Sequence, residues 1–354
     1  MEKLKLNETP VRTSRNFNIN NIKLEDVVIP ETIGTFNNVE IKKETSKIKI
    51  ENGTKDCNLV YGLGEILTNQ VVKQTNQKLK VNIDSKTNQE IQIEFTFDKE
   101  NTKLVDDIEI EANEETKSTI IIKYETENEV EAFHNGILRL QAKKNSQVNV
   151  ILANFMNLQS HHFLSIQNTL EENARVNYTI IDFGGKNSIT NYYSNIVGDN
   201  ADNSLNTIYL GSKDQVFDLN YIAELRGKKS NINIEVEGAL KDHAKKHFKG
   251  TIDFKKGCKK ATGNEAENCM LLSDTARSLA LPMLLCSEEE VEGNHSSSAG
   301  KVGDKELFYI MSRGFTKKEA MKLLIRARFN KILESIKKEE LKEEISNEID
   351  RRLD

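Results

Sequence analysis

The middle of the chain, from about residue 55 to residue 290, consists of short segments in which apolar and polar residues alternate. Residues 80–84, 90–97 and 231–236 follow this pattern, and clusters of Asn, Gly, Ser, Lys and Asp separate the segments. Alternation with a period of two places one face of a β-strand in a core and the other face in water. The pattern therefore predicts a mainly β protein built from many short strands.

Strands of this kind fit a sandwich, a barrel or a β-solenoid. Asn52-Gly53 and Asn135-Gly136 are tight hairpin signals, but most of the predicted strands are not joined by such a pair, which disfavours a simple antiparallel meander. In a solenoid, coils of about 20–30 residues stack so that each coil buries its apolar face on the next. We favour the solenoid, although no strict repeat is visible in the sequence.

The two ends of the chain differ from this middle part. Residues 1–54 are polar and contain Pro10 and Pro30, and they predict a short, partly extended N-terminal arm with a short helical segment. The β-solenoid core is expected at residues 55–300. From residue 301 to residue 354 the apolar period becomes helical, which predicts a small C-terminal α-helical subdomain.

This C-terminal part carries clear helix signals. Asp304 is expected to cap a short helix that stops at Gly314, and Thr316 with Glu319 forms a capping box that opens the next helix. The apolar stripes expected on that helix and on the last one consist of Ala320, Leu323, Leu324, Ala327, Ile332 and Ile336, and of Leu341, Ile345 and Ile349. Basic residues outnumber acidic ones by eight to three between residues 304 and 331. Such a surface is either a solvated helical face or a docking surface for an acidic partner.

Composition narrows the functional classes. The chain has 354 residues, and Lys+Arg 50 against Asp+Glu 55 gives a formal net charge of −5, which disfavours nucleic-acid binding. The apolar runs are too short to cross a bilayer, and the first seven residues lack the apolar region of a secretory signal. Four cysteines do not make a disulfide framework in so long a chain. These features predict a cytoplasmic protein without membrane contact.

Cys258, Cys269, Cys286 and His295 lie in one 38-residue window. Thiolates and imidazoles are ligands that soft and borderline metals prefer, but the wide, irregular spacing disfavours a preformed zinc site. Apolar neighbours predict buried thiols at Cys269 and Cys286, whereas the lysines around Cys258 predict an exposed thiol in a turn. The sequence contains no phosphate-binding loop, nucleophile elbow or His-Glu-x-x-His motif, so composition and spacing alone identify no active site.

An ordered series of short motifs occupies residues 248–330. It comprises Phe248-Lys249-Gly250-Thr251-Ile252, Leu271-Leu272, Leu281-Pro282-Met283-Leu284, Val291-Glu292-Gly293-Asn294-His295, Leu307-Phe308-Tyr309 and Ser312-Arg313-Gly314-Phe315, followed by Glu319-Ala320. The series resembles the C-terminal half of the SufB/SufD family, the paired scaffold subunits of the SUF iron–sulfur cluster assembly system. Residues 170–185 add weaker support. The remainder of the chain matches the family only in its general pattern of short alternating segments.

The resemblance implies a right-handed parallel β-helix whose C-terminal helices, around residues 308–329, dock an ABC-type ATPase, SufC. In the family, ATP-driven dimerisation of two such ATPases opens the interface of a SufB–SufD pair for cluster assembly. The scaffold subunit itself hydrolyses nothing, and ATP is bound by SufC. The resemblance thus implies a non-catalytic protein without a permanently bound cofactor, which holds iron or an iron–sulfur cluster transiently at a subunit interface.

The same resemblance points to individual residues. His295 matches the family histidine at the subunit interface, which is implicated in holding nascent iron–sulfur species. Glu267 stands where SufB has a reactive cysteine, and Cys269 lies two residues further on, on the same face of a strand. Ser296 replaces the glutamate that follows the SufB histidine. These departures, and a chain shorter than a typical SufB, indicate a SufD-like subunit. The residues expected to bind the ATPase are Phe308, Tyr309, Arg313, Gly314, Leu323, Leu324, Arg326 and Phe329.

Two alternatives remain open from the sequence. The partner is either a SufB-like paralogue or a second copy of this chain in a reduced SUF system, because heterodimer and homodimer edges use the same backbone hydrogen bonds. A carbohydrate-active β-helix enzyme would use clustered acids on one solenoid face. This enzyme reading is disfavoured because the sequence shows neither a paired Asp motif nor an export signal.

Overall fold

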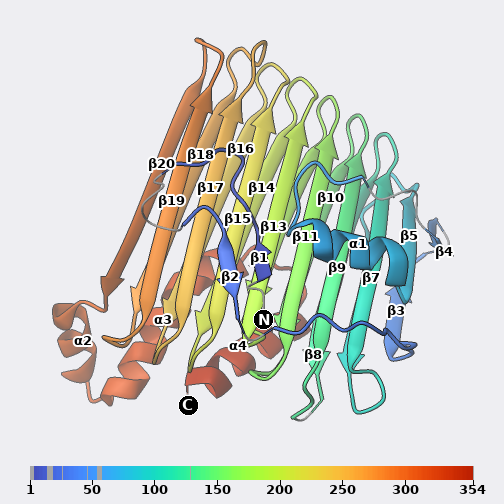
Figure 1. Cartoon of the computed structure of the whole chain (residues 1–354). Helices are drawn as coiled ribbons and strands as arrows, with labels where there is room; N and C mark the ends of the chain where they lie inside the picture. Colours follow the sequence, from blue (N-terminus) through green and yellow to red (C-terminus); the bar gives the residue numbers. More distant parts are fainter. Residues whose placement is uncertain are drawn as a thin grey trace.

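The computed structural model of the chain describes residues 4–13, 19–25, 27–45, 47–53, 58–127 and 129–353. Cys57 lies outside these residues. About half of the described residues belong to two nine-stranded sheets, and from residue 77 onward the strands alternate along the sequence from one sheet to the other. A strand that leaves one sheet therefore enters the other, and the chain coils along the stack (Figure 1).

The first sheet consists, in spatial order, of β20 (Glu292–Lys301), β18 (Thr262–Leu271), β16 (Asn231–Leu240), β14 (Asp202–Gly211), β12 (Arg175–Asp182), β10 (Gln147–Phe155), β8 (Lys117–Thr126), β6 (Gln89–Phe97) and β3 (Val39–Lys43). The second consists of β19 (Arg277–Cys286), β17 (Lys245–Phe254), β15 (Val216–Leu225), β13 (Asn187–Ile196), β11 (His161–Leu170), β9 (Phe133–Ala142), β7 (Lys103–Ala112), β5 (Gln77–Ile83) and β4 (Ile48–Asn52). All neighbours are parallel except β3 with β6 and β4 with β5, which are antiparallel and close the N-terminal end.

Neighbouring strands are separated by one coil of chain. The offset between residues paired in register runs from 26, at His162 and Ser188, to 32, at Lys245 and Arg277. This spacing is that of a stack in which each coil buries its apolar face on the next. The structure confirms the predicted parallel β-solenoid, and the parallel pairing explains why hairpin signals are absent between most strands.

The core lies between the two sheets and is formed by the inward-facing residues of both. It includes a column of aromatic rings in which Tyr178, Tyr192, Tyr221 and Phe248 follow one another with ring centroids 5.2, 6.0 and 5.8 Å apart. Edge-to-face contacts at these separations are favourable beyond the area that the rings bury. The column links successive coils, so the stack is continuous up to β17.

The N-terminal segments cover the outer face of the second sheet. Helix α1 (Glu65–Gln74) packs on β7 and β9, and β1 (Leu4–Leu6) pairs antiparallel with β2 (Ile22–Leu24) on the same side (Figure 1). The short helix expected within residues 1–54 does not occur among the described residues of that range, and the first helix is α1, outside it. Helix α1 is only ten residues long and is stabilised by contacts of Leu67 and Val71 with the sheet.

Three helices follow the last strand, and the second and third of them cover the outer face of the first sheet. They are α2 (Asp304–Met311), α3 (Lys317–Leu333) and α4 (Glu339–Leu353), which confirms the predicted helical end (Figure 1). Both hydrogen bonds of the capping box between Thr316 and Glu319 are formed. Leu341, Ile345 and Ile349 are buried as the stripe predicted.

Helix α3 departs from its predicted stripe. Its buried residues are Ala320, Ile325, Phe329, Ile332 and Leu333, whereas Leu323 is 41% exposed. Ala320 and Ile332 of the predicted stripe are buried, and the helix also rests on the sheet through Phe329, which stacks on the outward ring of Phe183.

Candidate functional site

The solenoid ends at β19 and β20, the last strands of the two sheets. Within the described part of the chain no further strand pairs with their outer edges, and every residue of β20 is exposed. An uncovered edge strand presents unpaired backbone N–H and C=O groups and is a template for pairing with another chain. Pro282 lies on β19, an edge position that tolerates its missing N–H, whereas β20 has no proline.

The inward face of the last coils is polar. On β18, Glu265, Glu267 and Cys269 alternate toward the space between the sheets, and β20 pairs in register so that His295 lies beside Glu265 and Ser297 beside Glu267. Ser297 donates a hydrogen bond to Oε2 of Glu267 at 2.8 Å. His295, two residues before Ser297, lies on the same face. The three residues predicted as metal ligands, His295, Glu267 and Cys269, therefore share one inward face at the open end.

Glu267 belongs to a closed network of buried groups. Lys246 of β17 donates to Oε1 of Glu267 at 2.7 Å, and both side chains are fully buried. The Tyr209 hydroxyl donates to the same oxygen at 3.2 Å. The carboxylate of Glu267 thus accepts hydrogen bonds from a lysine, a tyrosine and a serine side chain. Its main role in this structure is to neutralise the buried charge of Lys246.

Glu265 has a different environment. It is 3% exposed, and neither carboxyl oxygen has a hydrogen-bond partner among the described residues. Burial, reinforced by the charge of Glu267, raises the pKa of Glu265 to about 8. Sequence reasoning missed this residue, because in the sequence it is one more polar position in an alternating strand.

The cysteines do not form a joint site. Cys269 is buried in the central core, and burial raises the pKa of its thiol, which favours the neutral form. The predicted accessibilities of the other two were wrong. Cys258 is buried because its turn directs the side chain into the core, and Cys286 is exposed because it lies at the end of the last strand of its sheet. No group of three or more His, Cys, Asp or Glu side chains suited to a metal ion occurs among the described residues.

The second predicted site lies on the C-terminal helices. Phe308 is 74% exposed and Tyr309 is 59% exposed on α2, and Leu323 of α3 is also exposed. The guanidinium of Arg313 lies over the Tyr309 ring, 5.0 Å from its centroid, and donates to the Tyr309 hydroxyl at 2.9 Å. Gly314 has φ +97°, so it ends this segment in the left-handed conformation that the sequence indicated. Phe308 and Tyr309 thus form an accessible aromatic surface on α2, and Leu323 is exposed on the neighbouring helix α3.

The remaining predicted partner-binding residues face the protein. Phe329 is 1% exposed and stacks on Phe183 with ring centroids 6.3 Å apart. Leu324 packs against the same cluster, and Arg326 forms an ion pair with Asp350 of α4. Phe329 is therefore buried under α3, whereas Leu324 and Arg326 are half-buried and remain partly accessible.

A cleft of about 410 Å³ separates the end of β20 from α2 and α3. Cys269, Met270, Gly300, Glu306, Leu324 and Arg328 are among its lining residues. Its lining comes from the last strands and from the helices, and of the predicted site residues it includes Cys269 and Leu324. Figure 1 places α2 at this end of the stack, next to β19 and β20.

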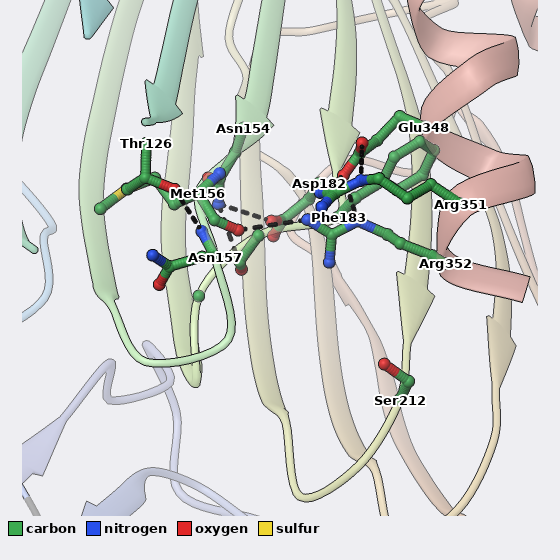
Figure 2. A network of polar contacts seen from close by, with 12 residues as sticks. Thr126, Asn154, Met156, Asn157, Asp182, Phe183, Ser212, Glu348, Arg351 and Arg352 are labelled. Carbon is green, nitrogen blue, oxygen red and sulfur yellow. Dashed lines mark hydrogen bonds and ion pairs between the residues drawn. The ribbon is translucent and has the colours of Figure 1, made fainter. Parts of the chain in front are cut away.

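The end of α4 is anchored in the solenoid, as Figure 2 shows. Arg352 donates to the carbonyl oxygen of Met156 at 3.1 Å and to Oε1 of Glu348 at 2.5 Å. Nearby, Asp182 accepts hydrogen bonds from Ser188 at 2.7 Å and from Asn154 at 2.9 Å. Burial raises the pKa of Asp182 to about 6, although these donors act in the opposite direction.

The described part of the chain contains no helix whose length and apolar character would let it cross a membrane. A model of the family described as "SUF system FeS cluster assembly, SufBD core domain" matches residues 95–328. This span covers the solenoid from β6 onward and continues into α3.

Several curated proteins are similar to the chain. An iron-sulfur cluster assembly protein SufD of Bacillus subtilis is 30% identical over 166 residues, which are 47% of this chain and 38% of that protein. The SufD protein of Escherichia coli is 24% identical over 240 residues, 68% of this chain and 57% of that protein. An iron-sulfur cluster assembly SufBD family protein of Pyrococcus horikoshii is 31% identical over 163 residues, 46% and 35% of the two chains. The chain thus spans less than two thirds of the length of these relatives, and it belongs to the SufB/SufD family as a SufD-like member.

Proposed function

We propose that this protein is a non-catalytic scaffold subunit of iron–sulfur cluster assembly. It pairs through the open end of its solenoid with a SufB-like subunit and binds a SufC-type ABC ATPase through its C-terminal helices. ATP is bound by that ATPase, and the work takes place in the cytoplasm. The observation that carries the proposal is the juxtaposition of two uncovered edge strands, β19 and β20, with the exposed aromatic surface of α2.

The open end suits pairing by strand addition. β20 is polar and rich in small residues, with Gly293, Ser296, Ser297 and Ser298 among them, so a second strand can approach its backbone closely. Main-chain hydrogen bonds then supply affinity, and the inward side chains supply specificity. Because His295 lies on this strand, pairing encloses its imidazole between two subunits, where it would hold iron or a nascent cluster as cargo.

The helices suit a second partner. Exposed aromatic side chains such as Phe308 and Tyr309 are typical anchors of protein interfaces. An ATPase bound to α2 would lie next to the edge strands β19 and β20. Its movement would therefore act directly on the end of the solenoid that pairs with the SufB-like subunit. This arrangement links ATP binding in the partner to opening of the interface.

Co-expression with a SufB-like subunit and a SufC-type ATPase tests the proposal. Phe308→Asp should abolish co-purification of the ATPase while the SufB-like subunit is retained. Val197→Asp changes an exposed apolar residue directly after β13, outside the C-terminal helices, and serves as the matched control. Retention of the ATPase by the Phe308 variant would contradict the docking surface. If the chain forms only homodimers in this experiment, its pairing partner is a second copy of the chain and not a SufB-like subunit.

A further inference from the structure

The buried carboxyl of Glu265 lacks the interactions that its neighbour has. Glu267 receives hydrogen bonds from Lys246, Tyr209 and Ser297, whereas neither oxygen of Glu265 has a partner among the described residues although its side chain is 3% exposed. A buried polar group without a hydrogen bond costs free energy, and an ionised one costs considerably more. Such a group indicates that something else occupies its oxygens in the working protein.

The fold makes room for this carboxyl. Gly250 of β17 lies opposite Glu265, and a Cβ atom at residue 250 would be 1.9 Å from Oε2 of Glu265. Gly250 does not have the left-handed backbone that would by itself favour glycine. The glycine is therefore explained by the space that the Glu265 side chain occupies. The carboxyl has a built position between the sheets and is not a displaced surface group.

The uncovered terminal strand β20 lies directly beside this position. His295 is paired in register with Glu265 on the terminal strand and lies on the same inward face. No further strand covers it within the described residues. The neighbouring positive charge of Lys246 is already neutralised by Glu267. The carboxyl group of Glu265 and the imidazole of His295 thus occupy neighbouring positions on the last two strands of the first sheet. Lys246 does not compete for the Glu265 carboxyl, because it is paired with Glu267.

We infer that Glu265 and His295 form a half-site for a divalent transition-metal ion such as Fe²⁺, which the inward face of a paired subunit or an inorganic ligand completes. The carboxylate oxygen and the imidazole nitrogen are a donor pair that suits ferrous iron. This inference rests on the proposed function for the role of His295 at a subunit interface, and it adds Glu265 as a second ligand from the same chain. Two ligands leave most coordination positions free, so the ion remains exchangeable, as a cargo metal must be.

Anaerobic titration of the purified full-length chain tests the half-site. Titration with Fe²⁺ gives the affinity of the chain for the ion. Titration with Co²⁺ shows, through the absorption bands of the bound ion, which kinds of side chain coordinate it. The wild-type chain should bind one ion, and Glu265→Gln and His295→Ala should each weaken binding at least about tenfold. Gly250→Ala should weaken it as well, because the added methyl group displaces the carboxyl. Glu292→Gln removes an exposed carboxylate from the same terminal strand and should change nothing.

The outcomes separate this inference from the proposed function. Glu265→Gln replaces an unpartnered carboxyl by a neutral amide, so the variant should fold and should still co-purify with the SufB-like subunit and the ATPase. Equal affinity of wild-type and Glu265→Gln chains for Fe²⁺, or an unchanged Co²⁺ spectrum, would overturn the half-site and leave the scaffold function intact. Binding of no ion by the wild-type chain below millimolar concentration would overturn it too. Failure of the wild-type chain to pair would instead contradict the proposed function.

Discussion

The ammonium group of Lys246 and the carboxylate of Glu267 form a fully buried ion pair, 2.7 Å between Nζ and Oε1, inside the last coils of the solenoid. The pair joins β17 of one sheet to β18 of the other, so it fixes the distance between the sheets just before the stack ends. Ser297 extends the network to the terminal strand. The position of β20 therefore depends on this charge pair.

Removal of one partner of this pair should be strongly destabilising. Lys246→Met leaves the carboxylate of Glu267 buried without its cation, and we expect the free energy of unfolding to fall by about 3–5 kcal/mol. Urea denaturation measures the loss. The double variant Lys246→Met/Glu267→Leu removes both charges and should recover most of it. A single variant as stable as the wild type would show that the pair is not buried as described.

The stability of the protein should depend on pH through Asp182. Burial raises its folded-state pKa to about 6, above the usual unfolded value of about 3.9. The folded state therefore binds more protons than the unfolded state between these values, and the free energy of unfolding contributed by Asp182 decreases as the pH rises through this window. The decrease between pH 4.5 and pH 7 is on the order of 2 kcal/mol.

The variant Asp182→Asn isolates this effect. Urea denaturation of wild-type and variant chains at both pH values gives the difference in unfolding free energy. We expect the variant to gain stability relative to the wild type as the pH is raised. A difference that does not change with pH would show that folding does not raise the pKa of Asp182.

Two residues of α3 should separate stability from partner binding. Phe329→Ala removes a buried ring that stacks on Phe183, and it should cost about 3–5 kcal/mol and increase hydrogen exchange of α3. Leu323→Ala changes an exposed side chain and should alter stability by no more than about 0.5 kcal/mol, while it weakens ATPase binding. If Leu323→Ala destabilised the protein without weakening ATPase binding, the docking surface would not include Leu323.

His295 should matter for cargo and not for folding. Its strand is exposed throughout, so His295→Ala should leave the unfolding free energy within about 0.5 kcal/mol of the wild type. Iron retained by the anaerobically reconstituted complex should fall, while the ATPase remains bound. Ser296→Ala on the same strand is the control. Iron content equal to that of the wild-type complex would contradict the predicted role of His295.

The sequence allowed the architecture to be predicted because alternation reports which face of each strand is buried. The coil repeat was missed, although a weak signal for it exists. Many of the sharp turns have one residue with positive φ followed by a small buried residue, as at Asn145 with Ser146 and Asn173 with Ala174. The residues in the left-handed position vary between Asn, Asp, Lys and Glu, so the repeat is visible only once the turns are known.

The candidate site was less predictable because alternation loses its meaning where the stack ends. His295 lies on an inward face yet is exposed, since no following coil covers it. The same reason explains why Cys286 is exposed. Glu265 could not be recognised from its own sequence context, because its distinguishing feature is the absence of partners across the sheets. The sequence does not distinguish Phe329 from Leu323, since both are large apolar residues of the same helix. Phe329 is buried because it stacks on Phe183 of the sheet, whereas Leu323 is exposed.

The central claim is that β20 is the edge through which this scaffold pairs. Hydrogen–deuterium exchange of residues 292–301, measured before and after addition of a SufB-like subunit, tests it most directly. The account predicts that the amides of this strand that point away from β18 exchange rapidly in the isolated chain and become protected in the complex, while those of β17 stay protected throughout. Unchanged exchange at residues 292–301 in a complex that has demonstrably formed would contradict it.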